Sequence, residues 1–184
     1  MTWHAGFTLL VFVAVVSNAQ APPRTVEAAE AEGAKYPKGT AGPDGTAWDK
    51  THAEAAGAGE RRCIDVEKHA SVRSGEFVAG PFQEYIVMAG TGKRKLWWAP
   101  RRHSAAMPPL QLRATKLDAP DVSVDWTLPS IVHNQNGYFF NTLILFPENG
   151  KWLVVARSGD NWGCFLITEI NAPKKTVPAA PNRH

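Results

Sequence analysis

Between residues 61 and 171 the apolar side chains recur with the two-residue period of β-strands. The clearest case is Val122–Leu128 (VSVDWTL), in which Val and Trp and Leu side chains alternate with Ser, Asp and Thr. Because successive side chains of a strand point to opposite faces of a sheet, this segment has one apolar and one polar face. The region carries no sustained apolar stripe with the 3.6-residue period of a helix. The pattern predicts an all-β domain.

The expected strands are short and are separated by turn-forming residues. Gly-Pro, Pro-Pro, Ala-Pro and Asn-Gly pairs and a Ser-Gly-Asp-Asn run lie between them, and these residues favour turns. Roughly seven to eight strands with turns about every 8–12 residues predict a β-sandwich, and a small barrel is the alternative. Besides Val122–Leu128, the expected strands are Cys63–Glu67, Gly75–Val78, Gln83–Ala89, Lys95–Trp98, Leu110–Lys116, Tyr138–Phe146, Lys151–Ser158 and Trp162–Ile170.

The first 19 residues have the pattern of a signal peptide. Phe7–Val16 is an apolar run that is too short to span a bilayer but suits the hydrophobic region of an export signal. Small residues follow, and we expect cleavage after Ala19. Since no Lys or Arg precedes the run, an uncleaved anchor or a buried strand is the alternative. No later segment approaches the ~20 apolar residues of a membrane helix, so we expect a secreted or periplasmic protein with no stable membrane span.

Residues 20–60 differ from the strand-rich region in composition and in charge. They are rich in Ala, Gly, Glu, Pro and Thr, and their large apolar residues are essentially Val26, Tyr36 and Trp48. Such a segment buries too little surface to offset the entropy of ordering it, so we expect a disordered tether. The Pro-rich tail, residues 172–184, is expected to be disordered as well. Residues 1–60 carry four basic and seven acidic groups and residues 61–184 carry sixteen and ten, so the net charge of +3 conceals a basic domain.

The chain has two cysteines, Cys63 and Cys164. In an oxidising compartment they have one possible intramolecular pairing, which would close a loop of about 100 residues and stabilise the fold by up to about 4–5 kcal/mol. The alternatives are a free nucleophilic thiol or half of a metal site, and neither is supported by a CxxC motif or a neighbouring His. We therefore expect a structural disulfide.

The last third of the chain resembles a known type of domain. In FPENGKWLVVARSGDNWGCFLITEI, Pro147, Gly150 and Trp152 begin one strand, and a turn at Gly159–Asn161 leads into the final strand. This segment is similar to the closing hairpin of small exported bacterial immunoglobulin-like domains. The resemblance implies an immunoglobulin-like β-sandwich for residues 61–171 and brings no catalytic residues with it. The antibody-type spacing of Cys, Trp and Cys is absent.

The segment Lys93–His103 is the most distinctive candidate for ligand binding. It holds five Lys or Arg residues, no acid and two adjacent Trp residues. Since neighbours in a strand point to opposite faces, one Trp would fill the core and the other would be presented outward beside cationic groups. That combination suits sugars and polyanions; the alternative is that both Trp residues are structural. The candidates are Lys93, Arg94, Lys95, Trp97, Trp98, Arg101 and Arg102.

A second polar and aromatic cluster lies at His133–Asn141 (HNQNGYFFN). Asn136-Gly137 favours a tight turn between two strands. A hairpin tip with His133, Asn134 and Tyr138 could form hydrogen bonds with a glycan or a peptide. The alternative is a turn with no binding role.

Other motifs give no support for catalysis or for a cofactor. Gly90–Lys93 resembles a phosphate-binding loop, but Val87 and Arg94 replace its first Gly and its hydroxyl residue. No Gly-x-Ser-x-Gly motif and no HxH or HxxxH pair occurs. We expect a non-catalytic binding module of the cell envelope or extracellular space, with a glycan, an acidic polymer or an envelope protein as partner and not nucleic acid. The alternatives are a periplasmic copper- or zinc-handling protein and an enzyme whose site is assembled only in space.

The expected signal peptide gives a first testable prediction. If cleavage follows Ala19, the exported chain begins at Gln20, and N-terminal sequencing together with the intact mass identifies that terminus. An exported chain that still begins at Met1 would contradict it.

Overall fold

The computed structural model describes residues 22–37, 59–67, 69–82, 93–103, 106–134, 137–170 and 172. Within these residues the chain forms one helix and ten strands. The elements are α1 (Val26–Gly33), β1 (Cys63–Asp65), β2 (Val72–Ser74), β3 (Phe77–Gly80), β4 (Arg94–Pro100), β5 (Leu110–Lys116), β6 (Ala119–Leu128), β7 (Val132–Asn134), β8 (Gly137–Ile144), β9 (Gly150–Ser158) and β10 (Asn161–Glu169).

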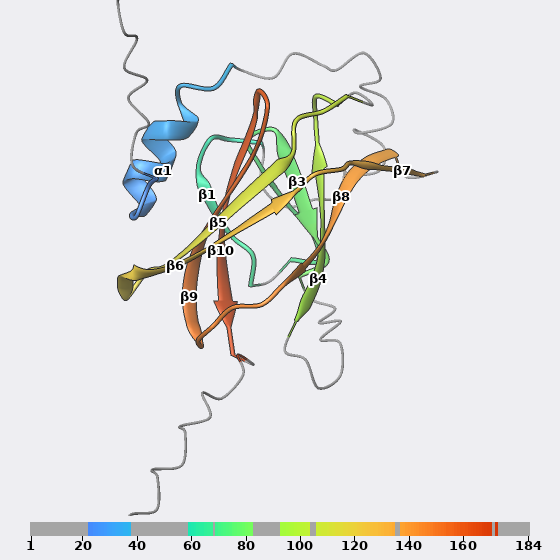
Figure 1. The fold of residues 1–184 in the computed structure, drawn as a ribbon. Helices are drawn as coiled ribbons and strands as arrows, with labels where there is room; N and C mark the ends of the chain where they lie inside the picture. Colours follow the sequence, from blue (N-terminus) through green and yellow to red (C-terminus); the bar gives the residue numbers. More distant parts are fainter. Residues whose placement is uncertain are drawn as a thin grey trace, which may run out of the picture.

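The strands form two five-stranded sheets that pack face to face (Figure 1). Sheet A has the order β2-β3-β4-β8-β7, and sheet B has the order β1-β10-β9-β5-β6. All neighbouring strands are antiparallel except β1 and β10, which are parallel. The sequence-based prediction of an all-β sandwich is confirmed.

The strand order is that of an immunoglobulin-like domain. If β3 to β10 are taken as strands A, B, C, C′, D, E, F and G, sheet A reads A-B-E-D and sheet B reads G-F-C-C′. Strands β1 and β2 extend the two sheets at their G and A edges. The two strands that the sequence pattern missed, β2 and β7, have three residues each, which is too short to establish a period. The expected strand Gln83–Ala89 lies outside the described residues.

Aromatic side chains from both sheets fill the space between them. Trp98 of β4 and Phe165 of β10 meet edge to face with ring centroids 5.3 Å apart, and Phe146 lies 5.3 Å from Trp152 of β9. All four are almost fully buried, as is Phe140 of β8. The edge strand β6 keeps its predicted alternation, since its burial pattern alternates between exposed and partly buried along Val122–Leu128.

A second apolar cluster lies on the outer face of sheet B, where α1 covers it (Figure 1). Strands β9 and β10 contribute Leu153, Val155, Trp162 and Cys164, and the helix contributes Ala29. A Cβ atom placed on Gly33 would lie 2.6 Å from the Trp162 ring, so the helix approaches the sheet this closely because Gly33 has no side chain.

The helix differs from the disordered tether that the composition predicts for residues 20–60. Residues 22–37 are ordered on sheet B, and residues 38–58 lie outside the described residues. The composition of the helix misled the prediction, because the large apolar group of this contact, Trp162, comes from the sheet and the helix supplies small residues. Thr25 begins the helix, since its hydroxyl oxygen accepts a hydrogen bond of 3.2 Å from the Ala28 amide.

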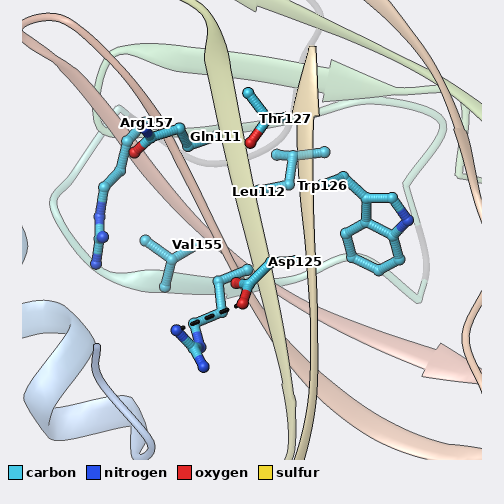
Figure 2. Close-up of a pocket in the computed structure, with 8 residues that line it drawn as sticks. Gln111, Leu112, Asp125, Trp126, Thr127, Val155 and Arg157 are labelled. Atoms are coloured by element: carbon cyan, nitrogen blue, oxygen red, sulfur yellow. Dashed lines mark ion pairs between the residues drawn. The ribbon is translucent and has the colours of Figure 1, made fainter. Parts of the chain in front are cut away.

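Beyond the helix, the outward side chains of β6 are exposed, and those of β5 range from exposed at Gln111 to buried at Thr115. A cavity of about 230 Å³ lies there, lined by residues of β5, β6 and β9 (Figure 2). A second cavity of about 440 Å³ lies beside α1, and Arg157 of β9 lines both.

The predicted disulfide is confirmed: Cys63 and Cys164 are joined, and they lie directly opposite each other in the β1–β10 register. The two cysteines are 101 residues apart in the sequence, so in the loop-entropy model the bond destabilises the unfolded chain by about 4–5 kcal/mol. Replacing both cysteines by Ala should lower the free energy of unfolding by about 2–5 kcal/mol. Urea denaturation of the variant and of reduced wild type measures the loss. The two samples should agree, and an unchanged midpoint in both would contradict the stabilising role.

Candidate functional site

The basic residues of the segment Lys93–His103 lie in two groups, one at each end of β4. Lys93 and Lys95 lie at the start of the strand, and Arg101 and Arg102 follow its last residue. Seven residues at about 3.3 Å each separate the two groups by roughly 20 Å. Of the cations expected beside an outward Trp, Lys95 therefore lies on the same face of β4 as Trp97, and Arg101 and Arg102 lie beyond the last residue of the strand.

Arg94 belongs to the interior. Its Nε atom lies 2.5 Å from Oε2 of Glu169, and the two side chains are 6% and 1% exposed. Its guanidinium also donates to the Thr168 carbonyl at 3.3 Å. This buried ion pair joins sheet A to sheet B, so Arg94 is a structural residue.

The two adjacent Trp residues point to opposite faces, as the strand geometry requires. Trp98 is in the core, and its indole Nε1 donates a hydrogen bond of 3.0 Å to Oγ1 of Thr142. The Thr142 hydroxyl in turn donates to the Leu96 carbonyl at 3.0 Å. Trp97 is half-buried on the outer face of sheet A, opposite Asn141 of β8. Trp98 is therefore unavailable to a ligand.

The pairing of β4 with β8 brings the two candidate clusters together. Because Trp98 lies opposite Phe140, the residues after β4 lie beside the residues that begin β8. The Tyr138 ring lies 4.5 Å from the His103 ring and 4.4 Å from the His133 ring. His133 is exposed, and His103 and Tyr138 are half-buried. We call these three rings the His–Tyr–His cluster; His103 was outside the candidate set.

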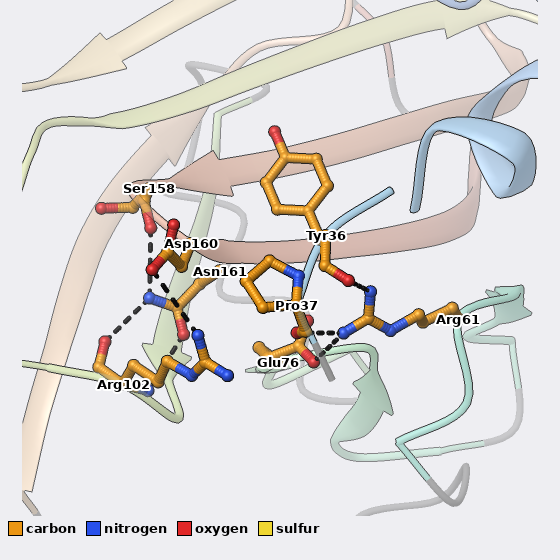
Figure 3. Close-up of polar contacts among 8 residues, drawn as sticks. All are labelled: Tyr36, Pro37, Arg61, Glu76, Arg102, Ser158, Asp160 and Asn161. Atoms are coloured by element: carbon orange, nitrogen blue, oxygen red, sulfur yellow. Dashed lines mark hydrogen bonds and ion pairs between the residues drawn. The ribbon is translucent and has the colours of Figure 1, made fainter. Parts of the chain in front are cut away.

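Asn161 holds the backbone of Arg102 at this end of the sandwich (Figure 3). Its Oδ1 accepts a hydrogen bond of 2.9 Å from the Arg102 amide, and its Nδ2 donates to the Arg102 carbonyl at 2.8 Å and to the Ser158 carbonyl at 3.1 Å. Asn161 is 2% exposed. The Arg102 guanidinium lies 3.6 Å from the carboxylate of Asp160, which is 71% exposed. The Arg102 backbone is thus fixed, and its ion pair is loose.

The backbone of Arg101 is held by Glu76, which is connected through Arg61 to the carboxyl end of α1. The Arg101 amide donates a hydrogen bond of 2.7 Å to the Glu76 carbonyl. The Glu76 carboxylate pairs with Arg61 at 2.6 Å, and Arg61 also donates to the carbonyls of Tyr36 and Pro37 (Figure 3). A further hydrogen bond of 2.7 Å joins Arg61 to the Gly33 carbonyl. Arg61 therefore satisfies carbonyls at the carboxyl end of α1.

The resulting surface combines aromatic rings with cations on rigid backbone. His133, Asn134 and Tyr138 come from the β7–β8 hairpin, and Arg101, Arg102 and His103 follow β4. Asn134 is exposed and lies opposite Gly137. Among the described residues, no group of three or more His, Cys, Asp or Glu side chains is placed to hold a metal ion. The arrangement is suited to stacking and to charge-assisted hydrogen bonds.

No sequence pattern predicts the polar cavity on the outer face of sheet B. Its charged residues, Arg113, Asp125 and Arg157, come from three strands, so no local motif marks them. The neighbouring cavity is lined by Tyr36, whose pKa is raised by burial; Arg157 opposes that shift and Glu32 adds to it. The one available signal was the polar face of Val122–Leu128, which includes Asp125.

Comparison of the chain with models of protein families, with curated proteins and with solved structures finds no match. The fold is an all-β sandwich of two five-stranded sheets, and its strand order is immunoglobulin-like. In the part of the chain that the structure describes, no helix is long and apolar enough to cross a membrane.

Because Arg94 is buried and Lys95 is exposed, replacing each should change the unfolding free energy by different amounts. Arg94→Met leaves the Glu169 carboxylate buried without its cation, which should cost about 3–5 kcal/mol of unfolding free energy. Lys95→Met, at the exposed neighbouring position, should change it by less than about 0.5 kcal/mol. Chemical denaturation measures both, and equal effects would contradict the assignment.

Proposed function

We propose that the protein is an exported, non-catalytic immunoglobulin-like module that binds an acidic glycan. The proposed site is the end of the sandwich that carries the His–Tyr–His cluster with Arg101 and Arg102. The single observation that carries this proposal is the convergence of the two candidate segments, since Tyr138 contacts both His103 and His133 beside the residues that follow β4.

The chemistry of these groups favours a sugar that carries negative charge. Ring faces stack on the apolar faces of sugars, and Tyr and His add polar atoms at the ring edge. Arg is suited to carboxylates and sulfates because its planar guanidinium donates two parallel hydrogen bonds. The Asp160 carboxylate pairs with Arg102 at 3.6 Å, which is beyond a hydrogen bond, so a ligand can compete for that contact.

Export supports a glycan or envelope polymer as the partner class over nucleic acid. That inference rests on the predicted signal peptide and on the disulfide, because disulfides persist in oxidising compartments. A second candidate is copper or zinc handling in the periplasm, favoured by the two imidazoles that contact Tyr138.

The proposal is tested by replacing Arg101 and Arg102 together with Ala. The affinity for a heparin oligosaccharide should fall by about tenfold or more, because two charge-assisted contacts are lost, and the variant should leave a heparin column at lower salt. The matched control is Arg24→Ala with Arg62→Ala, which removes the same charge at side chains that are 64% and 67% exposed and lie elsewhere.

An equal loss in both double variants would show a response to net charge alone and would overturn the site. Tyr138→Ala should weaken binding without changing the salt dependence, since it removes a ring and no charge. Elemental analysis after mild dialysis completes the test, because a stoichiometric copper or zinc ion would replace the glycan proposal with metal handling.

A further inference from the structure

The cavity of about 230 Å³ on the outer face of sheet B lies over β5, β6 and β9 and is lined by none of the residues of the His–Tyr–His cluster. Its floor includes Val155, which is 2% exposed. Figure 2 shows Val155 between Arg157 and Asp125. Gln111 and Thr127, both exposed, face each other across the β5–β6 pair and add neutral polar groups.

Two arginines border this cavity on neighbouring strands. Arg157 lies opposite Gln111, and Arg113 lies opposite Val155, so the arginines are offset by two residues across the β5–β9 pair. Residues in this diagonal relation are about 7–8 Å apart, within reach of long side chains. Both guanidinium groups can therefore address one small anion.

The hydrogen-bond donors of Arg113 and Arg157 have partners in the protein only in part. Arg113 donates to Oγ of Ser123 at 3.2 Å, and its distance of 3.6 Å to Asp125 is beyond a hydrogen bond. Arg157 pairs closely with Glu32 of α1. The Nε atoms of both arginines are buried and have no hydrogen-bond partner in the described part of the chain. Since an Arg side chain has five N–H donors and these two side chains are 28% and 27% exposed, their terminal nitrogens keep donors for a ligand.

We propose that this cavity binds a monosaccharide acid. The carboxylate would accept hydrogen bonds from Arg113 and Arg157, displacing the loosely held Asp125, and the sugar hydroxyls would contact Gln111 and Thr127. The volume of about 230 Å³ is below the range of about 300–1,000 Å³ for drug-sized ligands, which favours a single ring over an oligosaccharide. This site shares no residue with the one at Arg101 and Arg102.

Titration of the full exported chain with sodium glucuronate at constant ionic strength tests the proposal. The side-chain Nε–Hε NMR signals of Arg113 and Arg157 should shift together and saturate, while that of exposed Arg62 should not. Glucose and acetate serve as probes of the hydroxyl and carboxylate contributions, and each should bind at least about tenfold more weakly than glucuronate.

Two substitutions at exposed positions test the cavity without disturbing the fold. Gln111→Glu places a negative charge beside the ligand and should abolish the shifts. Asp125→Asn removes the competing carboxylate and should tighten binding severalfold, whereas the matched control Asp118→Asn, at a carboxylate of similar exposure, should not.

Absence of a saturable shift at Arg113 and Arg157 would overturn the proposal, as would equal binding of acetate and glucuronate. Binding of glucuronate that persists in the Arg101 and Arg102 double variant is the expected result, because the two sites use different residues. Loss of glucuronate binding in that variant would contradict the second site.

Discussion

The antiparallel pairing of β4 with β8 determines both the core and the surface of this protein. Trp98 lies opposite Phe140 in the interior, and Trp97 lies opposite Asn141 on the outer face. A shift of one residue in this register would exchange the two faces and remove Trp98 from its contacts with Thr142 and Phe165. The same register places the residues after β4 beside Tyr138, so the proposed glycan site depends on the packing of the core.

A second constraint acts on the outer face of the last strand. Trp162 and Cys164 are there, where an uncovered sheet would expose a large ring to water. The disulfide to Cys63 and the close approach of Gly33 cover these groups. Arg61 links α1 to the β-sandwich, because it contacts both the end of the helix and the buried Glu76. The helix packs on β1, β9 and β10, and the cavity of about 230 Å³ lies beside it over β5, β6 and β9.

The sequence predicted the features that depend on a local alternation of side chains, and it predicted the disulfide because two cysteines allow only one pairing. The alternation of Val122–Leu128 indicated a strand, and two cysteines allowed one disulfide. The sequence could not determine which of Trp97 and Trp98 is buried. Alternation places the two side chains on opposite faces of the strand but does not show which face is turned to the core. Arg94 was misread for a related reason, since its partner Glu169 is 75 residues away. The helix escaped detection because its apolar partner lies in another element.

We propose that two segments separated in the sequence form one ligand-binding surface. The most direct measurement is an NMR titration of the full chain with a heparin oligosaccharide, following the ring signals of His103, His133 and Tyr138 and the guanidinium signals of Arg101 and Arg102. We predict that all five residues shift along one binding curve with a single dissociation constant. Shifts confined to one of the two segments, or spread evenly over the basic residues of the chain, would contradict the account.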